Sequence, residues 1–146
     1  MGGTIEDNTI NTRINHMSAT PHKDTAIADT GATGTFLTTT APCSNKEQDI
    51  YPIQVSLPNG QNICSTHRCT LDLPSLPREA REAHILPGLA NNSLISIAKL
   101  CDSGLKAVFT NTKVDILRGD KTVLTGNRDI CTGLWRLPLK TEQCNM

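Results

Sequence analysis

The chain has 146 residues, 37% of them hydrophobic and only 3% aromatic, with 14 basic and 14 acidic residues and no net charge. This length fits one domain that can bury a core without disulfides or metals, and the balanced charge argues against nucleic-acid binding, which needs clustered Lys and Arg. No apolar run approaches the ~20 residues of a membrane-spanning helix, so we expect no membrane segment.

The first half of the chain predicts short strands joined by turns. Residues 1–23 are polar and lack periodicity, which is typical of a flexible leader. A short apolar run at 25–28 then predicts a strand that ends in the turn Asp29-Thr30-Gly31. Residues 36–40 follow as a possible second strand, and residues 41–50 are expected to form a polar loop.

A hairpin and a helix are the clearest elements after residue 50. Residues 53–57 alternate apolar and polar side chains, and Pro58-Asn59-Gly60 predicts a hairpin turn with a return strand over 61–73, within which its length predicts a bend or bulge. The spacing of apolar residues from 94 to 101 predicts a helix, with Ser93 as its N-cap and Gly104 as its C-terminal cap. Further segments are a helical turn at 78–83 and strands at 84–88, 105–110, 113–117, 121–125 and 134–139.

The six cysteines are expected to be free thiols. The N-terminus lacks a basic region followed by an apolar stretch, so we predict a cytoplasmic, reducing location. Cys64, His67 and Cys69 lack the paired spacing of a structural zinc site, and we therefore predict no metal.

Asp29 is the residue whose setting suggests chemistry. Aspartates hydrolyse peptides in pairs, in which one carboxylate takes a proton from water while the other donates to the carbonyl oxygen. An apolar strand delivers Asp29, Gly31 allows a tight turn that brings an amide to the carboxylate, and the small residue Ala32 follows. Asp and Gly are also common in plain turns, so these residues alone leave both interpretations open.

The order of the motifs resembles the retropepsin family, and more closely the protease segment of copia-type retrotransposon polyproteins. The resemblance covers roughly residues 24 to 139. The matching segments are Asp29-Thr30-Gly31-Ala32-Thr33, Val55 to Gly60, His84 to Leu89, Asn92 to Leu100, Gly104 to Phe109 and Gly133 to Leu137.

This resemblance implies an all-β fold, a closed β-barrel with one short C-terminal helix and an added C-terminal hairpin. Residues 24–110 would be the protease domain, 111–139 a hairpin extension with a closing strand, and 140–146 a tail. The active unit would be a homodimer that needs no cofactor.

The resemblance also assigns roles within the site. Asp29 would be the catalytic carboxylate, Thr30 a hydroxyl at the dimer interface, and Gly31 and Ala32 the support of the active site. The tip Pro58, Asn59 and Gly60 would be the flap that covers the peptide substrate.

The expected function is an aspartic endopeptidase that processes a retroelement polyprotein. One alternative is a catalytically inactive, transposon-derived module that acts in protein interaction, and a weaker one is a cellular ubiquitin-pathway domain of the same fold. Asp102-Ser103-Gly104 resembles a second catalytic motif, but the segment before it predicts a helix, so we reject a two-lobed enzyme. His84 lies near no nucleophile motif and is expected to be structural.

Overall fold

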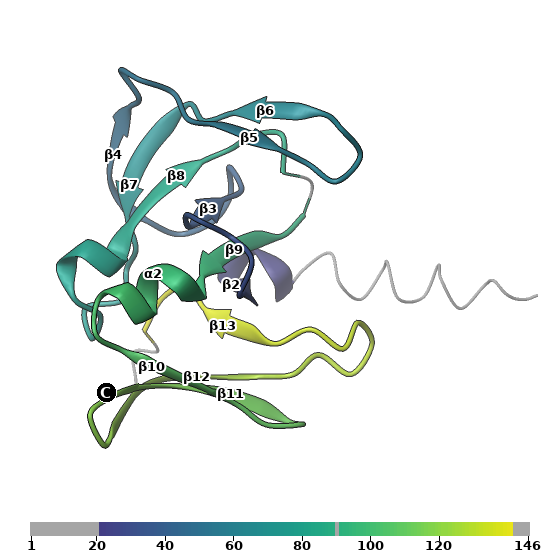
Figure 1. Ribbon diagram of the computed structural model, residues 1–146. Helices are drawn as coiled ribbons and strands as arrows, with labels where there is room; N and C mark the ends of the chain where they lie inside the picture. The colour runs from purple at the N-terminus through teal and green to yellow at the C-terminus, as the bar shows by residue number, and fades with distance from the viewer. Residues whose placement is uncertain (1–20, 90, 142–146) are drawn as a thin grey trace, which may run out of the picture.

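The computed structural model describes residues 21–89 and 91–141, and nearly all of its elements are strands (Figure 1). The all-β prediction is confirmed, because the described residues hold a single short α-helix. The bounds in chain order are η1 (Pro21–Asp24), β2 (Thr25–Asp29), β3 (Phe36–Leu37), β4 (Ser44–Gln48), β5 (Gln54–Ser56), β6 (Asn62–Cys64), β7 (His67–Thr70), η2 (Arg78–Arg81), β8 (Glu82–Ile85), β9 (Ser93–Ser96), α2 (Ile97–Asp102), β10 (Lys106–Phe109), β11 (Lys113–Arg118), β12 (Lys121–Asn127) and β13 (Arg136–Pro138).

The strands form three sheets. The largest has seven strands in the order β13-β2-β9-β3-β8-β7-β4, beside a three-stranded sheet β10-β11-β12 and the hairpin β5-β6. Figure 1 places the hairpin at one end of the molecule and the three-stranded sheet at the other, with β2, β3 and β9 between them. No ladder within the described ranges joins the outer strands β13 and β4, so the closed barrel implied by the resemblance is not shown.

The centre of the large sheet is the parallel pair β2 and β9, in which Asp29 lies opposite Ser96. Ala26 and Ala28 of β2 are buried, as are three of the four residues of β9. The near-continuous burial of β9 is typical of parallel strands that are covered on both faces, whereas β2 alternates buried and half-buried residues. The last residue of β2 therefore sits on one of the best-supported strands of the molecule.

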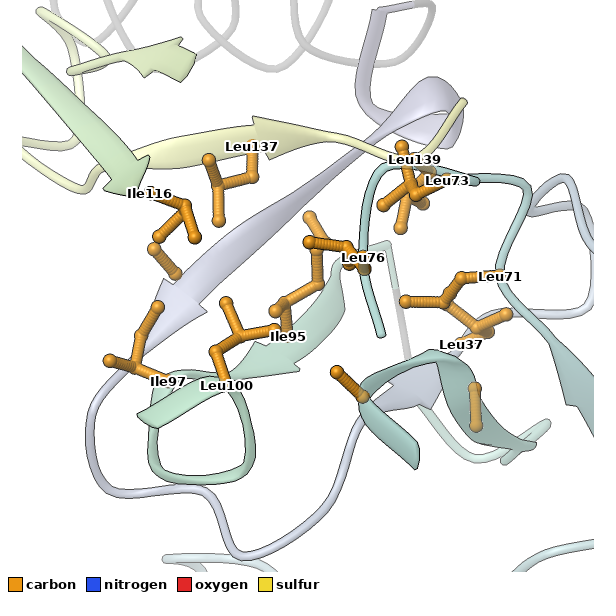
Figure 2. Packing of buried hydrophobic residues seen from close by; sticks show 14 of the residues in the cluster. Leu37, Leu71, Leu73, Leu76, Ile95, Ile97, Leu100, Ile116, Leu137 and Leu139 are labelled. Atoms are coloured by element: carbon orange, nitrogen blue, oxygen red, sulfur yellow. The ribbon is translucent and has the colours of Figure 1, made fainter. Parts of the chain in front are cut away.

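The main core is aliphatic, as the scarcity of aromatic residues requires. Ile95 of β9, Ile116 of β11 and Leu137 of β13 each have almost no exposed surface and belong to one cluster (Figure 2). Burying side chains of this size contributes roughly 1.5–3 kcal/mol each. The cluster joins the seven-stranded and three-stranded sheets into one body.

Three predicted elements differ from the structure. The helix was expected to begin after Ser93, but residues 93–96 form β9 and the helix begins at Ile97. Strand neighbours on both sides of β9 override its helical spacing. The predicted polar loop at 41–50 contains the edge strand β4, whose five residues are all exposed and so carry no apolar period. The return strand at 61–73 has the expected irregularity, at Ser65 and Thr66, but its two parts, β6 and β7, belong to different sheets.

Two other predictions concern the ends of the chain and the membrane. Most of the expected leader, residues 1–20, and the end of the tail, residues 142–146, lie outside the described residues. Within the described ranges, no helix has the length and apolar character needed to cross a bilayer.

Gly126 of β12 provides a test of how the C-terminal strands pack. A Cβ atom added there would lie 1.8 Å from the Arg136 carbonyl oxygen of β13. We expect Gly126→Ala to lower the free energy of unfolding by about 3 kcal/mol, because overpacking against backbone cannot be relieved by a rotamer change. Urea unfolding followed by circular dichroism measures this loss.

The matched control is Gly119→Asn in the β11–β12 turn. Gly119 has φ +60° with open space around it, and Asn tolerates this left-handed conformation. The control should cost about 0.5 kcal/mol or less. Equal losses in the two variants would contradict the close contact between β12 and β13.

Candidate active site

Asp29 ends β2, where the chain leaves the sheet for a loop that returns at β3. Its side chain is half-buried, and its Oδ1 accepts a hydrogen bond of 2.8 Å from the backbone amide of Gly31. The tight turn expected from the Asp-Thr-Gly sequence is therefore present, with the amide against the carboxylate. This hydrogen bond limits the rotation of the Asp29 carboxylate.

Ser96 holds this loop from the neighbouring strand. Its Oγ donates to the Ala32 carbonyl oxygen at 2.6 Å, and its backbone amide donates to the Oγ1 of Thr35 at 3.1 Å. The same Oγ accepts from the amide of Lys99 at 3.1 Å and so caps α2. One buried serine thus joins the loop, the end of β9 and the start of the helix.

The loop presents its tip to solvent. Thr30 and Gly31 are exposed and Ala32 is half-buried, so the three residues predicted as interface and support lie beside Asp29 on the surface. No hydrogen bond within the described residues joins Asp29 to a second carboxylate. Among the residues that the structure describes, this loop therefore presents one carboxylate, held by a backbone amide.

The predicted flap residues form the tip of the β5–β6 hairpin. Gly60 has φ +89° and its amide donates to Leu57, while the Asn59 Oδ1 accepts from the amide of Gln61. Pro58 is exposed, as are the other two tip residues. The structure thus has the hairpin at the expected position, with a polar tip.

The underside of this hairpin is apolar and packs on the sheet. Ile63 of β6 forms a small buried cluster with Phe36 and Leu86, and Val55 of β5 packs against it. Gly88 leaves room for this contact, since a Cβ atom there would lie 2.5 Å from the Ile63 side chain. The cluster is distinct from the main core, so the hairpin has its own small apolar seat.

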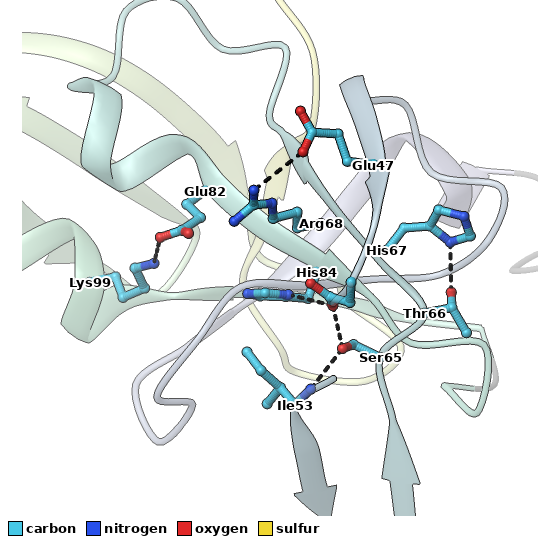
Figure 3. A network of polar contacts seen from close by, with 10 residues as sticks. Glu47, Ile53, Ser65, Thr66, His67, Arg68, Glu82, His84 and Lys99 are labelled. Carbon is cyan, nitrogen blue, oxygen red and sulfur yellow. Dashed lines mark hydrogen bonds and ion pairs between the residues drawn. The ribbon is translucent and has the colours of Figure 1, made fainter. Parts of the chain in front are cut away.

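A polar network ties the root of the hairpin to the sheet (Figure 3). The Asp49 Oδ2 accepts hydrogen bonds from the Ser65 hydroxyl and, at 3.0 Å, from the Nδ1 of His84 on β8. Ser65 also accepts from the amide of Ile53 at 2.9 Å, which links both ends of the hairpin. His84, which was expected to be structural, is hydrogen-bonded here and mostly buried.

The Asp49 carboxylate is 5% exposed and is held in its charged form. Burial alone raises the pKa of Asp49, but hydrogen bonds from Ser65 and His84 and the positive charges of His84 and Arg68 outweigh it. The pKa of Asp49 therefore lies below its ordinary value of 3.8. The hydrogen bonds at the hairpin root thus stabilise the charged form of Asp49.

The closing strand β13 covers the open edge of β2. The Ala28 amide donates to the Trp135 carbonyl at 2.8 Å, and the guanidinium of Arg136 reaches Thr25 and Asn92. Burial lowers the pKa of Arg136. The hydrogen bonds to Thr25 and Asn92 give its half-buried guanidinium partners. The C-terminal segment is thus part of the framework that carries Asp29.

Two other sequence motifs have structural explanations. Asp102 ends α2, and Gly104, at φ +92°, follows in the conformation of a helix C-terminal cap, so the segment is no second catalytic loop. Cys69 is buried beside Cys43, and this burial and the neighbouring thiol raise the pKa of Cys69 to about 12. Such a thiol stays protonated and is a poor nucleophile.

The sequence patterns did not reveal Ser96, Thr35 or Asp49. Ser96 lies three residues before Lys99, which is the spacing of an N-cap, but Ser93 offered an equal candidate. Thr35 and Asp49 lie in segments without periodicity, and their partners are at least 16 residues away in the sequence. Only the fold brings these residues together.

Comparison of the chain with protein-family models, with curated proteins and with solved structures finds no match. The geometry of the loop that carries Asp29 is therefore the main guide to the function.

The charge of Asp49 gives a pH-dependent prediction. Because its pKa is lowered in the folded state, its stabilising contribution is complete above 3.8 and is lost as pH falls through the folded pKa. At pH 7 we expect Asp49→Asn to lower the free energy of unfolding by about 1–3 kcal/mol. Urea unfolding at pH 7, 5, 3 and 2.5 should show this gap narrowing below pH 3.8.

Asp120→Asn, in the exposed β11–β12 turn, is the matched control, and we expect it to unfold like the wild type at each pH. A gap between Asp49→Asn and the wild type that stays constant down to pH 2.5 would show that the charge of the carboxylate does not support the hairpin root.

Proposed function

We propose that the protein is an aspartic endopeptidase, active as a homodimer in which each chain contributes one Asp29 loop. The observation that carries the proposal is the hydrogen bond from the Gly31 amide to the Asp29 carboxylate, on an exposed loop at the end of a strand whose alternate residues are buried. This arrangement fixes a half-buried carboxylate beside an exposed loop tip, and no hydrogen bond within the described residues joins it to a second carboxylate. A two-fold axis beside the loop would supply the second carboxylate.

The mechanism needs two carboxylates that share one proton. The ionised one takes a proton from a water molecule, whose oxygen attacks the carbonyl carbon of the peptide bond, while the protonated one donates to the carbonyl oxygen. The carboxyl group that took the proton from water then donates it to the amide nitrogen as the C–N bond of the tetrahedral intermediate breaks. The other carboxylate recovers its proton from the hydroxyl that becomes the carbonyl of the new acid. The chain's residues suffice for these steps, and no cofactor takes part.

Thr30 has the role of an interface hydroxyl in this proposal. It adjoins Asp29 and is exposed, so its side chain is free to hydrogen-bond to the loop of a second copy. Such reciprocal bonds would hold the two carboxylates at a constant separation. A closed, retropepsin-like barrel would then be completed around the site, in keeping with the resemblance in the motifs.

The β5–β6 hairpin is the proposed flap over the substrate. Its apolar underside and its charged root hold it on the same body as the Asp29 loop, while its tip, Pro58 to Gly60, is exposed. The substrate class is an extended peptide, and the resemblance suggests a retroelement polyprotein that is processed in the cytoplasm.

The first test replaces the carboxylate. We expect Asp29→Asn to abolish cleavage of fluorescein-labelled casein across pH 4 to 7, because a neutral amide cannot deprotonate water. The exposed position of the loop tip should leave thermal unfolding within a few degrees of the wild type. The matched control is Asp102→Asn at the end of α2, which keeps full activity if the site is Asp29 alone. Undiminished cleavage by Asp29→Asn would refute the proposal.

The second test addresses the dimer. We expect Thr30→Ala to weaken self-association about tenfold or more, since the loss of one hydroxyl from each chain removes two interface hydrogen bonds of roughly 0.5–1.5 kcal/mol each. Sedimentation velocity over a range of protein concentrations measures this. Thr33→Ala, at another exposed position of the same loop, is the control and should associate like the wild type. A wild-type chain that remains monomeric at all concentrations speaks for a non-catalytic interaction module instead.

A further inference from the structure

Ser96 touches the Asp29 loop and has no part in the proposed chemistry. Its side chain has no exposed surface, and it lies opposite Asp29 in the parallel pairing of β2 and β9. We propose that Ser96 is the positioning residue of the catalytic loop, residues 30–35, which follows Asp29. Ser96 holds the backbone that orients the Asp29 carboxylate. This inference rests on the proposed function, because the orientation of the Asp29 carboxylate affects a rate only if Asp29 takes part in a reaction.

The hydrogen bonds of Ser96 determine where its proton points. The Oγ accepts from the Lys99 amide at 3.1 Å, so its own hydrogen is free to be donated to the Ala32 carbonyl at 2.6 Å. A serine hydroxyl has one donor, and here that donor is committed to the loop. The start of α2 therefore orients the hydroxyl, and the hydroxyl orients the loop.

The bond to Ala32 reaches the carboxylate through one peptide unit. The Ala32 carbonyl is fixed by Ser96, and the amide of the residue before it, Gly31, donates to the Asp29 Oδ1. If the Ala32 carbonyl were released, the backbone between these two groups could rotate and withdraw the Gly31 amide from the carboxylate. The bond from the Ser96 amide to Thr35 holds the far end of the loop in the same way.

This arrangement predicts an effect on turnover rather than on substrate binding. Ser96 is buried and does not line a surface on which a peptide could lie, so its loss should leave KM within about twofold of the wild type. Misplacing a reacting group by about 1 Å can lower the rate on the order of 100-fold. We therefore expect Ser96→Ala to lower kcat by between about 10-fold and 100-fold.

The chain offers a closely matched control in Ser93. It lies on the same strand, is 1% exposed, and its Oγ accepts from the amide of Thr38 at 3.0 Å. Ser93→Ala removes a buried hydroxyl that also serves a backbone group, so it should destabilise the protein by a similar amount. Its partner, however, is Thr38, which follows β3 and lies beyond the loop that carries Ala32.

The experiment compares the full-length wild type with Ser96→Ala, Ser93→Ala and Ser96→Thr. Activity is measured with a quenched-fluorescence peptide that spans the casein bond cut fastest by the wild type, well below the unfolding midpoint of every variant. We expect a kcat-specific loss in Ser96→Ala, wild-type kcat in Ser93→Ala, and recovery to within about threefold in Ser96→Thr, because Thr keeps the hydroxyl and is also a favoured N-cap.

Equal kcat in Ser96→Ala and Ser93→Ala would overturn the inference while leaving the proposed function intact. Should Ser96→Ala fail to fold, Thr35→Val removes the acceptor of the Ser96 amide in an isosteric side chain, and the same selective loss of kcat is expected.

A wild type that cleaves nothing would overturn the proposed function instead. Hydrogen exchange at the Gly31 amide then decides the positioning role. We expect exchange at least tenfold faster than in the wild type for Ser96→Ala, and the wild-type rate for Ser93→Ala. Equal exchange in both variants would sink the inference independently of any activity.

Discussion

The parallel pairing of β2 with β9 is the constraint on which the rest of the molecule depends. It places Ser96 opposite Asp29, at the point where one strand ends in a loop and the other continues into α2. A single hydroxyl there satisfies groups from both departing segments, the Ala32 carbonyl and the Lys99 amide. Buried backbone groups need such partners, and the loop can leave the sheet in a defined direction because they are met.

The two apolar clusters stabilise different parts of the molecule, the sheets and the β5–β6 hairpin. The main cluster joins the seven-stranded and three-stranded sheets around Ile95 and Leu137, so the strand that carries Asp29 is anchored in the largest body of buried surface. The smaller cluster around Ile63 seats only the β5–β6 hairpin. The hairpin is therefore held in two ways, by this apolar cluster and by its polar root at Asp49, where a charge is stabilised by hydrogen bonds.

The C-terminal segment belongs to the same framework. Strand β13 pairs with β2 and accepts the Ala28 hydrogen bond, and Gly126 of β12 lies in backbone contact with it. A free edge on β2 would present unpaired amides beside the site, where another strand could add. With that edge covered, the exposed surface next to Asp29 is the loop itself, which is the surface that the proposed second copy would meet.

The sequence alone determined the all-β class, the turn after Asp29 and the hairpin at Pro58 to Gly60, because alternation and turn residues act over a few neighbouring positions. It could not separate β9 from the helix, since Leu94 and Ile95 suit either conformation and the pairing with β2 and β3 decided between them. The partners of Ser96 on the loop lie more than 60 residues from it, and those of Asp49 lie 16 and 35 residues away. Contacts at such separations leave no local period, so only the tertiary structure decided them.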